Sequence, residues 1–60
     1  MRTNSEIAFL IDERIHKSRD RQIMKRKEVD GITYEALAEE FAMSPRGLKY
    51  LVKRNREKIY

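Results

Sequence analysis

Hydrophobic residues recur at helical spacing near the start of the chain. Positions three and four residues apart share one side of a helix, and the positions that form this apolar stripe are Ile7, Leu10, Ile11 and Ile15. Thr3 stands before the stripe and is followed by Glu6 three residues later, which is the arrangement of a capping box at a helix N-terminus. A first helix is therefore predicted to begin at Thr3.

Phe9 does not belong to this stripe. At about 100° of rotation per residue, its side chain is predicted on the opposite side of the helix. Two interpretations are open at this point. Phe9 covers another part of the same fold, or it contacts a second copy of the chain in a homodimer.

A second helical segment, from about Arg19 to Glu28, has a weaker pattern. Its apolar residues are Ile23, Met24 and Val29. Ser18 is expected to end the first helix and to cap this one, although the pattern also allows one continuous helix. Asp30–Gly31 is expected to stop the segment, because glycine accepts the left-handed conformation that is common just past a helix end.

The strongest local signals lie in residues 33–58. Thr33 is placed to cap a short helix from Tyr34 to Phe41. Ser44 is placed to cap a last helix from Pro45 to about Lys58, and proline suits the first helical position because its missing N–H would have no partner there. Only two residues separate the first of these helices from Ser44, so the pair must cross steeply.

The apolar positions of this pair have the spacing of a DNA-binding helix-turn-helix. Counted from Tyr34, the fourth, eighth, tenth, fifteenth and eighteenth positions are apolar, and they are Leu37, Phe41, Met43, Leu48 and Leu51. The fifth position is Ala38, whose small side chain lets two helices cross closely. The pattern predicts an all-α fold, a three- to four-helix bundle in a single domain over residues 1–60. The N-terminal helices are expected within residues 3–28 and the helix-turn-helix within residues 33–58.

Residues 30–49 read D-G-I-T-Y-E-A-L-A-E-E-F-A-M-S-P-R-G-L-K, and residues 54–59 read R-N-R-E-K-I. This segment resembles region 4 of bacterial sigma factors and the small phage and mobile-element regulators of the same type, and the likeness covers roughly residues 18–59. The chain departs from that pattern at Ala42, where the family commonly has glycine, and at Gly47, where a residue with a side chain is usual. The resemblance implies binding to duplex DNA and contact with RNA polymerase.

Charge is distributed unevenly around a net value of +4. Residues 17–27 contain six basic residues and one acidic residue, and residues 44–60 contain the same numbers. Residues 32–43, which lie between them, contain three glutamates and no basic residue. Two basic segments of this kind are typical of a surface that binds a polyanion, although a solvated surface that keeps a small domain soluble has the same balance.

Other kinds of chemistry have little support. The chain has no cysteine, which excludes disulfides and thiolate metal sites, and its single histidine, His16, has no second ligand at metal spacing. No nucleophile motif or phosphate-binding glycine loop is present, so neither an enzyme nor a cofactor is expected. The longest apolar run, residues 7–11, is too short to span a membrane, and we expect a cytoplasmic protein with no membrane partner.

The outward side of the last helix carries the candidate DNA-binding residues. Arg46 is expected to read guanine through O6 and N7, and Lys49 to read guanine or bind phosphate. Tyr50 is expected to meet a thymine methyl group or a phosphate, and Lys53 and Arg54 to bind the DNA backbone. The full predicted set is Thr33, Ser44, Pro45, Arg46, Lys49, Tyr50, Lys53 and Arg54.

Two assignments stay open. Thr33 and Ser44 either cap their helices alone or also bind phosphate at the helix N-termini. The basic residues of 19–27 either lie along flanking DNA or form a solvated face. The predicted function is sequence-specific binding of double-stranded DNA by a transcriptional regulator, with the last helix in the major groove. The alternative is a protein-interaction module of the same fold that contacts RNA polymerase or another regulator.

Overall fold

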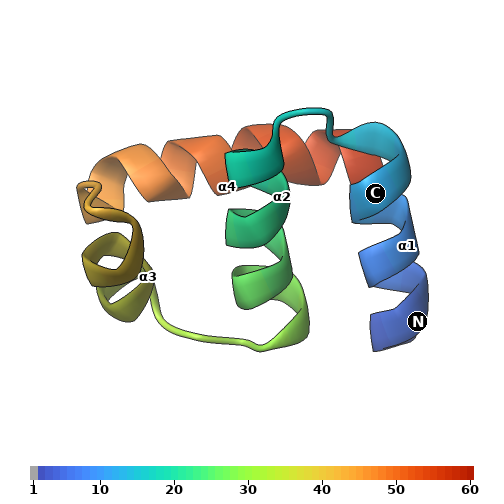
Figure 1. Cartoon of the computed structure of the whole chain (residues 1–60), viewed down its shortest axis with the longest axis horizontal. Helices are drawn as coiled ribbons and strands as arrows, with labels where there is room; N and C mark the ends of the chain where they lie inside the picture. The colour runs from blue at the N-terminus through green and yellow to red at the C-terminus, as the bar shows by residue number, and fades with distance from the viewer. Residues whose placement is uncertain (1) are drawn as a thin grey trace.

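The computed structural model describes residues 2–60, which form four α-helices and one π-helical turn (Figure 1). In chain order the elements are α1 (Asn4–Arg14), α2 (Ser18–Met24), the π-helical turn η1 (Lys25–Val29), α3 (Tyr34–Phe41) and α4 (Pro45–Ile59). No strand occurs within residues 2–60, and the predicted all-α fold is confirmed. α4 runs along the longest dimension of the molecule, α1 and α2 cross it, and α3 lies at its N-terminal end (Figure 1).

α1 begins with the predicted capping box. Thr3 Oγ1 accepts a hydrogen bond from the Glu6 N–H at 3.2 Å, and the Thr3 N–H donates to Glu6 Oε1 at 3.3 Å. The helix ends at Arg14 because Ile15 has an extended backbone, with φ of −108° and ψ of 118°. The Ile15 side chain is buried in the core, so the apolar stripe continues past the end of the helix itself.

The boundary between the first two helices differs from the prediction. α2 starts at Ser18, and the residue in the cap position, Lys17, makes no side-chain capping hydrogen bond. Ser18 is therefore the first helical residue and not a cap, and the alternative of one continuous helix is also wrong. Arg21 Nε donates to the Ile15 carbonyl oxygen, which ties the linker to α2 without a capping hydroxyl.

The second segment ends in a wider helical turn than expected. The Asp30 N–H donates to the Lys25 carbonyl oxygen at 3.1 Å, five residues back, which is the hydrogen bond of a π-helix. The chain then leaves the helix at Gly31, whose φ of +73° is a left-handed conformation that glycine adopts without strain. The predicted stop at Asp30–Gly31 is confirmed, whereas the π-helical turn has no counterpart in the apolar pattern.

The helix-turn-helix pair has the predicted caps. Thr33 Oγ1 accepts from the Ala36 N–H at 3.1 Å at the start of α3. Ser44 Oγ accepts from the Gly47 N–H at 3.1 Å at the start of α4, and Pro45 occupies the first helical position. Both hydroxyls satisfy backbone donors that have no partner within their own helix.

The turn between α3 and α4 contains the one non-glycine residue of positive φ within residues 2–60. Ala42 has φ of 53° and ψ of 45°. The Met43 N–H donates to the Ala38 carbonyl oxygen at 3.0 Å, and the Ala42 N–H donates to the Glu39 carbonyl oxygen at 3.4 Å. These two bonds form a Schellman motif, in which the left-handed position is most often glycine. The turn therefore holds a Cβ where a glycine would fit without strain.

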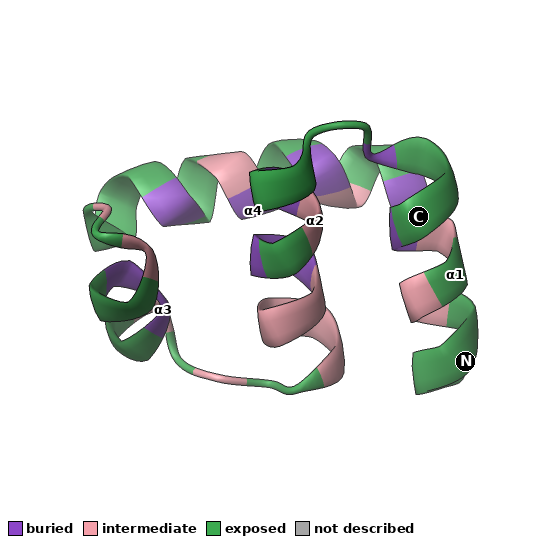
Figure 2. Ribbon diagram, viewed as in Figure 1, coloured by how far each residue is buried: buried purple, intermediate pink, exposed green. Residues whose placement is uncertain are grey.

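All four helices contribute side chains to a single core (Figure 2). The fully or nearly fully buried apolar residues are Ile11, Ile15, Ile23, Met24, Leu37, Ala38, Leu48, Val52 and Ile59. α4 also buries Asn55, which has no exposed surface. Because the inward residues of α4 recur every three or four positions, one long side of this helix faces the core and the other faces solvent.

α1 closes the C-terminal end of α4. Arg14 Nη1 donates to the Lys58 carbonyl oxygen at 3.2 Å, and Arg2 Nη1 donates to the Ile59 carbonyl oxygen. These carbonyls have no partner within the helix, and cations are favourable at this end of the helix dipole. The N-terminal helix therefore holds the far end of α4 and leaves its first turns uncovered.

Candidate nucleic-acid interface

The outward side of α4 carries the residues that the sequence predicts for DNA binding. Its buried residues are Leu48, Val52, Asn55 and Ile59. Rotation by about 100° per residue puts Arg46, Tyr50 and Lys53 on the side opposite to these. All eight predicted residues are exposed, and Tyr50 retains 69% of its surface. The exposed outer side of α4 is visible along the helix in Figure 2.

The arginines and lysines of the chain fall into two groups. One group binds the chain itself through hydrogen bonds or ion pairs, and its members are Arg2, Arg14, Arg21, Lys25, Arg26, Lys27 and Arg56. Within residues 2–60, the other group makes no side-chain hydrogen bond or ion pair. Five of its members lie on α4. Four of these, Arg46, Lys49, Lys53 and Arg54, lie on its first three turns, and Lys58 lies in its last turn. Positive charge without a partner is therefore concentrated on the exposed side of this helix.

Lys49 points to one flank of that side. Its Nζ lies 5.6 Å from the centroid of the Tyr34 ring, at the first residue of α3. Acidic residues also lie near the turn, because Glu35 and Glu39 line a shallow hollow beside Pro45. The cationic surface of α4 reaches the first turn of α3 at Tyr34, and that turn also carries Glu35.

Thr33 and Ser44 both use their hydroxyls as caps, which confirms the predicted caps, and phosphate binding at these two helix N-termini stays a prediction. Ser44 also gives a physical reason for Gly47. A Cβ at position 47 would lie 3.1 Å from Ser44 Oγ, closer than most Cβ contacts, so a side chain there would press on the capping hydroxyl. The departure at Gly47 is compatible with the cap, whatever else approaches that position.

Glu57 is a residue of this surface that the sequence analysis missed. It is exposed, and it lines a shallow hollow together with Tyr50, Lys53 and Arg54. The signal was present, because Glu57 is four residues after Lys53 and seven after Tyr50, which places it on their side of the helix. The Glu57 carboxylate would repel a polyanion, so the surface suited to a polyanion is the first three turns of α4.

Two cations of the basic segment of residues 19–27, Lys25 and Arg26, have a structural role in this fold. Lys25 Nζ lies 2.8 Å from Asp12 Oδ1 of α1. Arg26 Nη2 lies 3.0 Å from Glu40 Oε2 of α3, and hydrogen bonds to the Glu40 and Asp30 carboxylates raise the pKa of Arg26 above its ordinary value. Both cations are therefore neutralised by acidic residues of the chain, and neither is available to run along flanking DNA.

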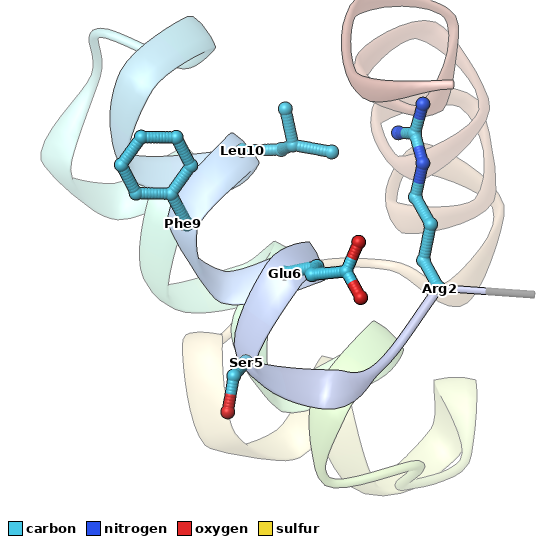
Figure 3. A pocket seen from close by; sticks show the side chains of 5 residues that line it. All are labelled: Arg2, Ser5, Glu6, Phe9 and Leu10. Atoms are coloured by element: carbon cyan, nitrogen blue, oxygen red, sulfur yellow. The ribbon is translucent and has the colours of Figure 1, made fainter.

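Phe9 does not pack against the fold. The side chain keeps 63% of its surface exposed on α1, so the expectation that it covers another part of the chain is wrong. It borders a hollow whose lining residues are Arg2, Ser5, Glu6, Phe9 and Leu10 (Figure 3).

Within residues 2–60, no group of three or more His, Asp or Glu side chains is placed to hold a metal ion. None of the helices described is long and apolar enough to cross a membrane.

No protein-family model matches the chain, and no curated protein or solved structure matches it either. The resemblance to sigma factor region 4 rests on the residues quoted above and stays a prediction.

Proposed function

We propose that this protein binds double-stranded DNA in a sequence-specific manner and regulates transcription, with α4 in the major groove. The observation that carries the proposal is the set of four cations on the first three turns of α4 that have no hydrogen-bond or ion-pair partner within residues 2–60. The B-DNA major groove is about 12 Å wide and admits one α-helix. A helix held by its far end and by α3, with its first turns exposed, has the shape that such a groove accepts.

Each exposed residue has a role suited to its place. Arg46 is next to the N-terminus of α4, where helix-turn-helix proteins meet base edges, and its guanidinium can pair with O6 and N7 of guanine. Lys53 and Arg54 lie farther along and suit phosphate contacts, which position the protein without reading sequence. Tyr50, between them, can contact a thymine methyl group.

The test is selection of bound duplexes from a pool of random sequence by the full chain. We expect a short motif to be enriched that contains at least one guanine. If repeated selection enriches nothing over the starting pool, sequence-specific binding is contradicted.

A second candidate function is supported by the acidic side of the turn. Glu35 and Glu39 line a hollow with Met43 and Pro45, and their carboxylates would repel DNA phosphates. A surface with acidic and apolar residues fits a basic protein segment, and RNA polymerase is one candidate. Replacing both glutamates with lysine should weaken binding to purified RNA polymerase and leave DNA affinity no weaker. Loss of polymerase binding without loss of DNA binding would support this second function beside the first.

The partner on the other side of the molecule is proposed to be a second copy of this chain. Phe9 and the hollow beside it are uncovered (Figure 3), and Arg2 and Glu6 give that surface one charge of each sign. A two-fold axis through this surface would place Arg2 of one copy opposite Glu6 of the other, so the surface can be self-complementary. Sedimentation equilibrium should show a dimer for the parent chain and a monomer for Phe9→Ser. A monomer for both would contradict the homodimer.

A further inference from the structure

Two lysines from different elements meet at one aromatic ring. Lys27 Nζ, from η1, lies 4.4 Å from the centroid of the Tyr34 ring, and Lys49 Nζ, from α4, lies 5.6 Å from the same point. Because both distances end at one centroid, the two nitrogens are at most 10.0 Å apart, the sum of the two distances. Tyr34 itself is the first residue of α3, so three elements converge here.

Lys27 differs from the other charged residues of η1. Lys25 pairs with Asp12, Arg26 with Glu40, and Glu28 with Arg56. Lys27 has no ion pair within residues 2–60, although it is partly buried in the same turn. Its ammonium group donates to the Ile32 carbonyl oxygen at 3.0 Å, which accounts for one of its three N–H donors.

The cluster therefore gathers positive charge that the chain does not neutralise. Lys49 makes no hydrogen bond or ion pair in the described residues, so its three donors are open, as are two donors of Lys27. The negative face of the Tyr34 ring offsets part of the repulsion, since each cation–π contact at an exposed site contributes only about 0.5–1 kcal/mol. An anion bound by both ammonium groups would remove the rest of the repulsion between them.

The position of the cluster indicates which anion. Lys49 lies on the flank of the proposed DNA-binding side of α4 that turns toward α3. When a helix occupies the major groove, the sugar–phosphate backbones run along its flanks. Tyr34 stands directly after the Thr33 cap, at the N-terminus of α3, where the helix dipole favours an anion and the Glu35 carboxylate of the same turn opposes it.

We propose that Lys27 and Lys49, held by the Tyr34 ring, bind one phosphate of the DNA backbone at the edge of the groove that α4 occupies. Lys27 thereby becomes a DNA-binding residue outside the helix-turn-helix pair. This inference rests on the proposed DNA-binding function, and it adds to that function a contact from η1.

The experiment measures the salt dependence of binding to a short fluorescent duplex by anisotropy, with the full chain. Removal of one phosphate contact reduces the magnitude of the log–log slope by about 0.9. Lys27→Gln removes one of the two cations at this phosphate, so the magnitude of its slope should fall by up to that amount and its affinity by up to about eightfold at 0.1 M salt. Lys27→Arg, which keeps the charge, should retain the slope of the parent.

The matched control is Lys17→Gln. Lys17 is an exposed lysine in the linker between α1 and α2, and its replacement removes the same net charge. We expect its slope to equal that of the parent chain. Tyr34→Phe should also keep the slope of the parent chain. Tyr34→Leu, which removes the ring, should reduce the magnitude of the slope. Circular dichroism of each variant confirms that the helices are intact.

The outcomes separate this inference from the function on which it rests. If Lys27→Gln has the same slope as Lys17→Gln while Lys53→Ala reduces the magnitude of the slope, the phosphate site is overturned and DNA binding by α4 stands. If neither Lys27→Gln nor Lys53→Ala alters the slope, the proposed DNA-binding side is wrong as well.

Discussion

Glu28 and Arg56 form an ion pair that joins the π-helical turn to the last turn of α4. Arg56 Nη2 donates to Glu28 Oε2 at 3.1 Å, and Arg56 Nε donates to Glu28 Oε1. The Glu28 side chain is only 10% exposed, and its hydrogen bonds raise the pKa of Arg56 above the ordinary value. The pair spans 28 positions of sequence and fixes α4 relative to the segment that carries Lys27.

Removing this pair should destabilise the fold. Arg56→Ala leaves a nearly buried carboxylate without its partner, and we expect the free energy of unfolding in urea to fall by about 1.5–3 kcal/mol. Arg54→Ala is the matched control, because Arg54 is exposed on the same helix with no partner in the described chain. Its effect should stay within about 0.5 kcal/mol. Equal effects for the two variants would show that the pair contributes nothing specific.

The left-handed turn residue predicts a stabilising substitution. Ala42 has φ of 53°, a conformation that costs an L residue about 1–2 kcal/mol. Glycine avoids this cost but loses about 0.5–1 kcal/mol more backbone entropy on folding. Ala42→Gly should therefore raise the free energy of unfolding by roughly 0.5–1 kcal/mol.

Ala36→Gly is the control for that substitution, because Ala36 is exposed within α3 at ordinary helical geometry. There the same change should lower the free energy of unfolding by about 1 kcal/mol. A loss of stability at both positions would contradict the strain assigned to Ala42.

The buried amide of Asn55 predicts a second stabilising substitution. Its side chain is fully buried, and neither Oδ1 nor Nδ2 has a hydrogen-bond partner within residues 2–60. A buried polar group in that state costs about 1–3 kcal/mol. Asn55→Leu has a similar volume and should raise the denaturation midpoint. If Asn55→Leu lowers it, the amide contributes to stability in a way that the structure does not explain.

The sequence predicts much of this fold because its strongest signals are local. Thr33, Ser44 and Pro45 mark helix starts through contacts only three residues long, and all three occupy the predicted positions. The stop at Gly31 is equally local, since it depends on the conformation of one residue.

The features that could not be predicted depend on distant partners. Ile15 belongs to the predicted apolar stripe and is buried, but the local pattern does not show that α1 ends before it. Arg26 and Glu40 are 14 positions apart, so the pairing of that cation with a carboxylate follows only from tertiary packing. The same is true of Lys27 and Tyr34, which approach across the loop between η1 and α3. The outer side of α4 was predictable because helical periodicity alone determines it.

We expect Arg46 to read a base and Lys53 to bind a phosphate, so substitutions at these two residues of α4 should have different effects on DNA binding. Arg46→Ala should relax the preference for one base pair, at a cost of about 1–3 kcal/mol on the preferred site. Lys53→Ala should weaken binding to every duplex by a similar factor. Binding to selected and scrambled duplexes by anisotropy distinguishes the two. If both variants bind all duplexes as the parent does, α4 does not face the DNA through this side.

The most direct test of the central claim is the affinity of the parent chain for duplex DNA across a range of salt concentration. Each cation of α4 that contacts a phosphate contributes about −0.9 to the slope of log affinity against log salt. With two to four such contacts, we expect a slope of about −2 to −4. A slope near zero, or no binding at low salt, would contradict the account.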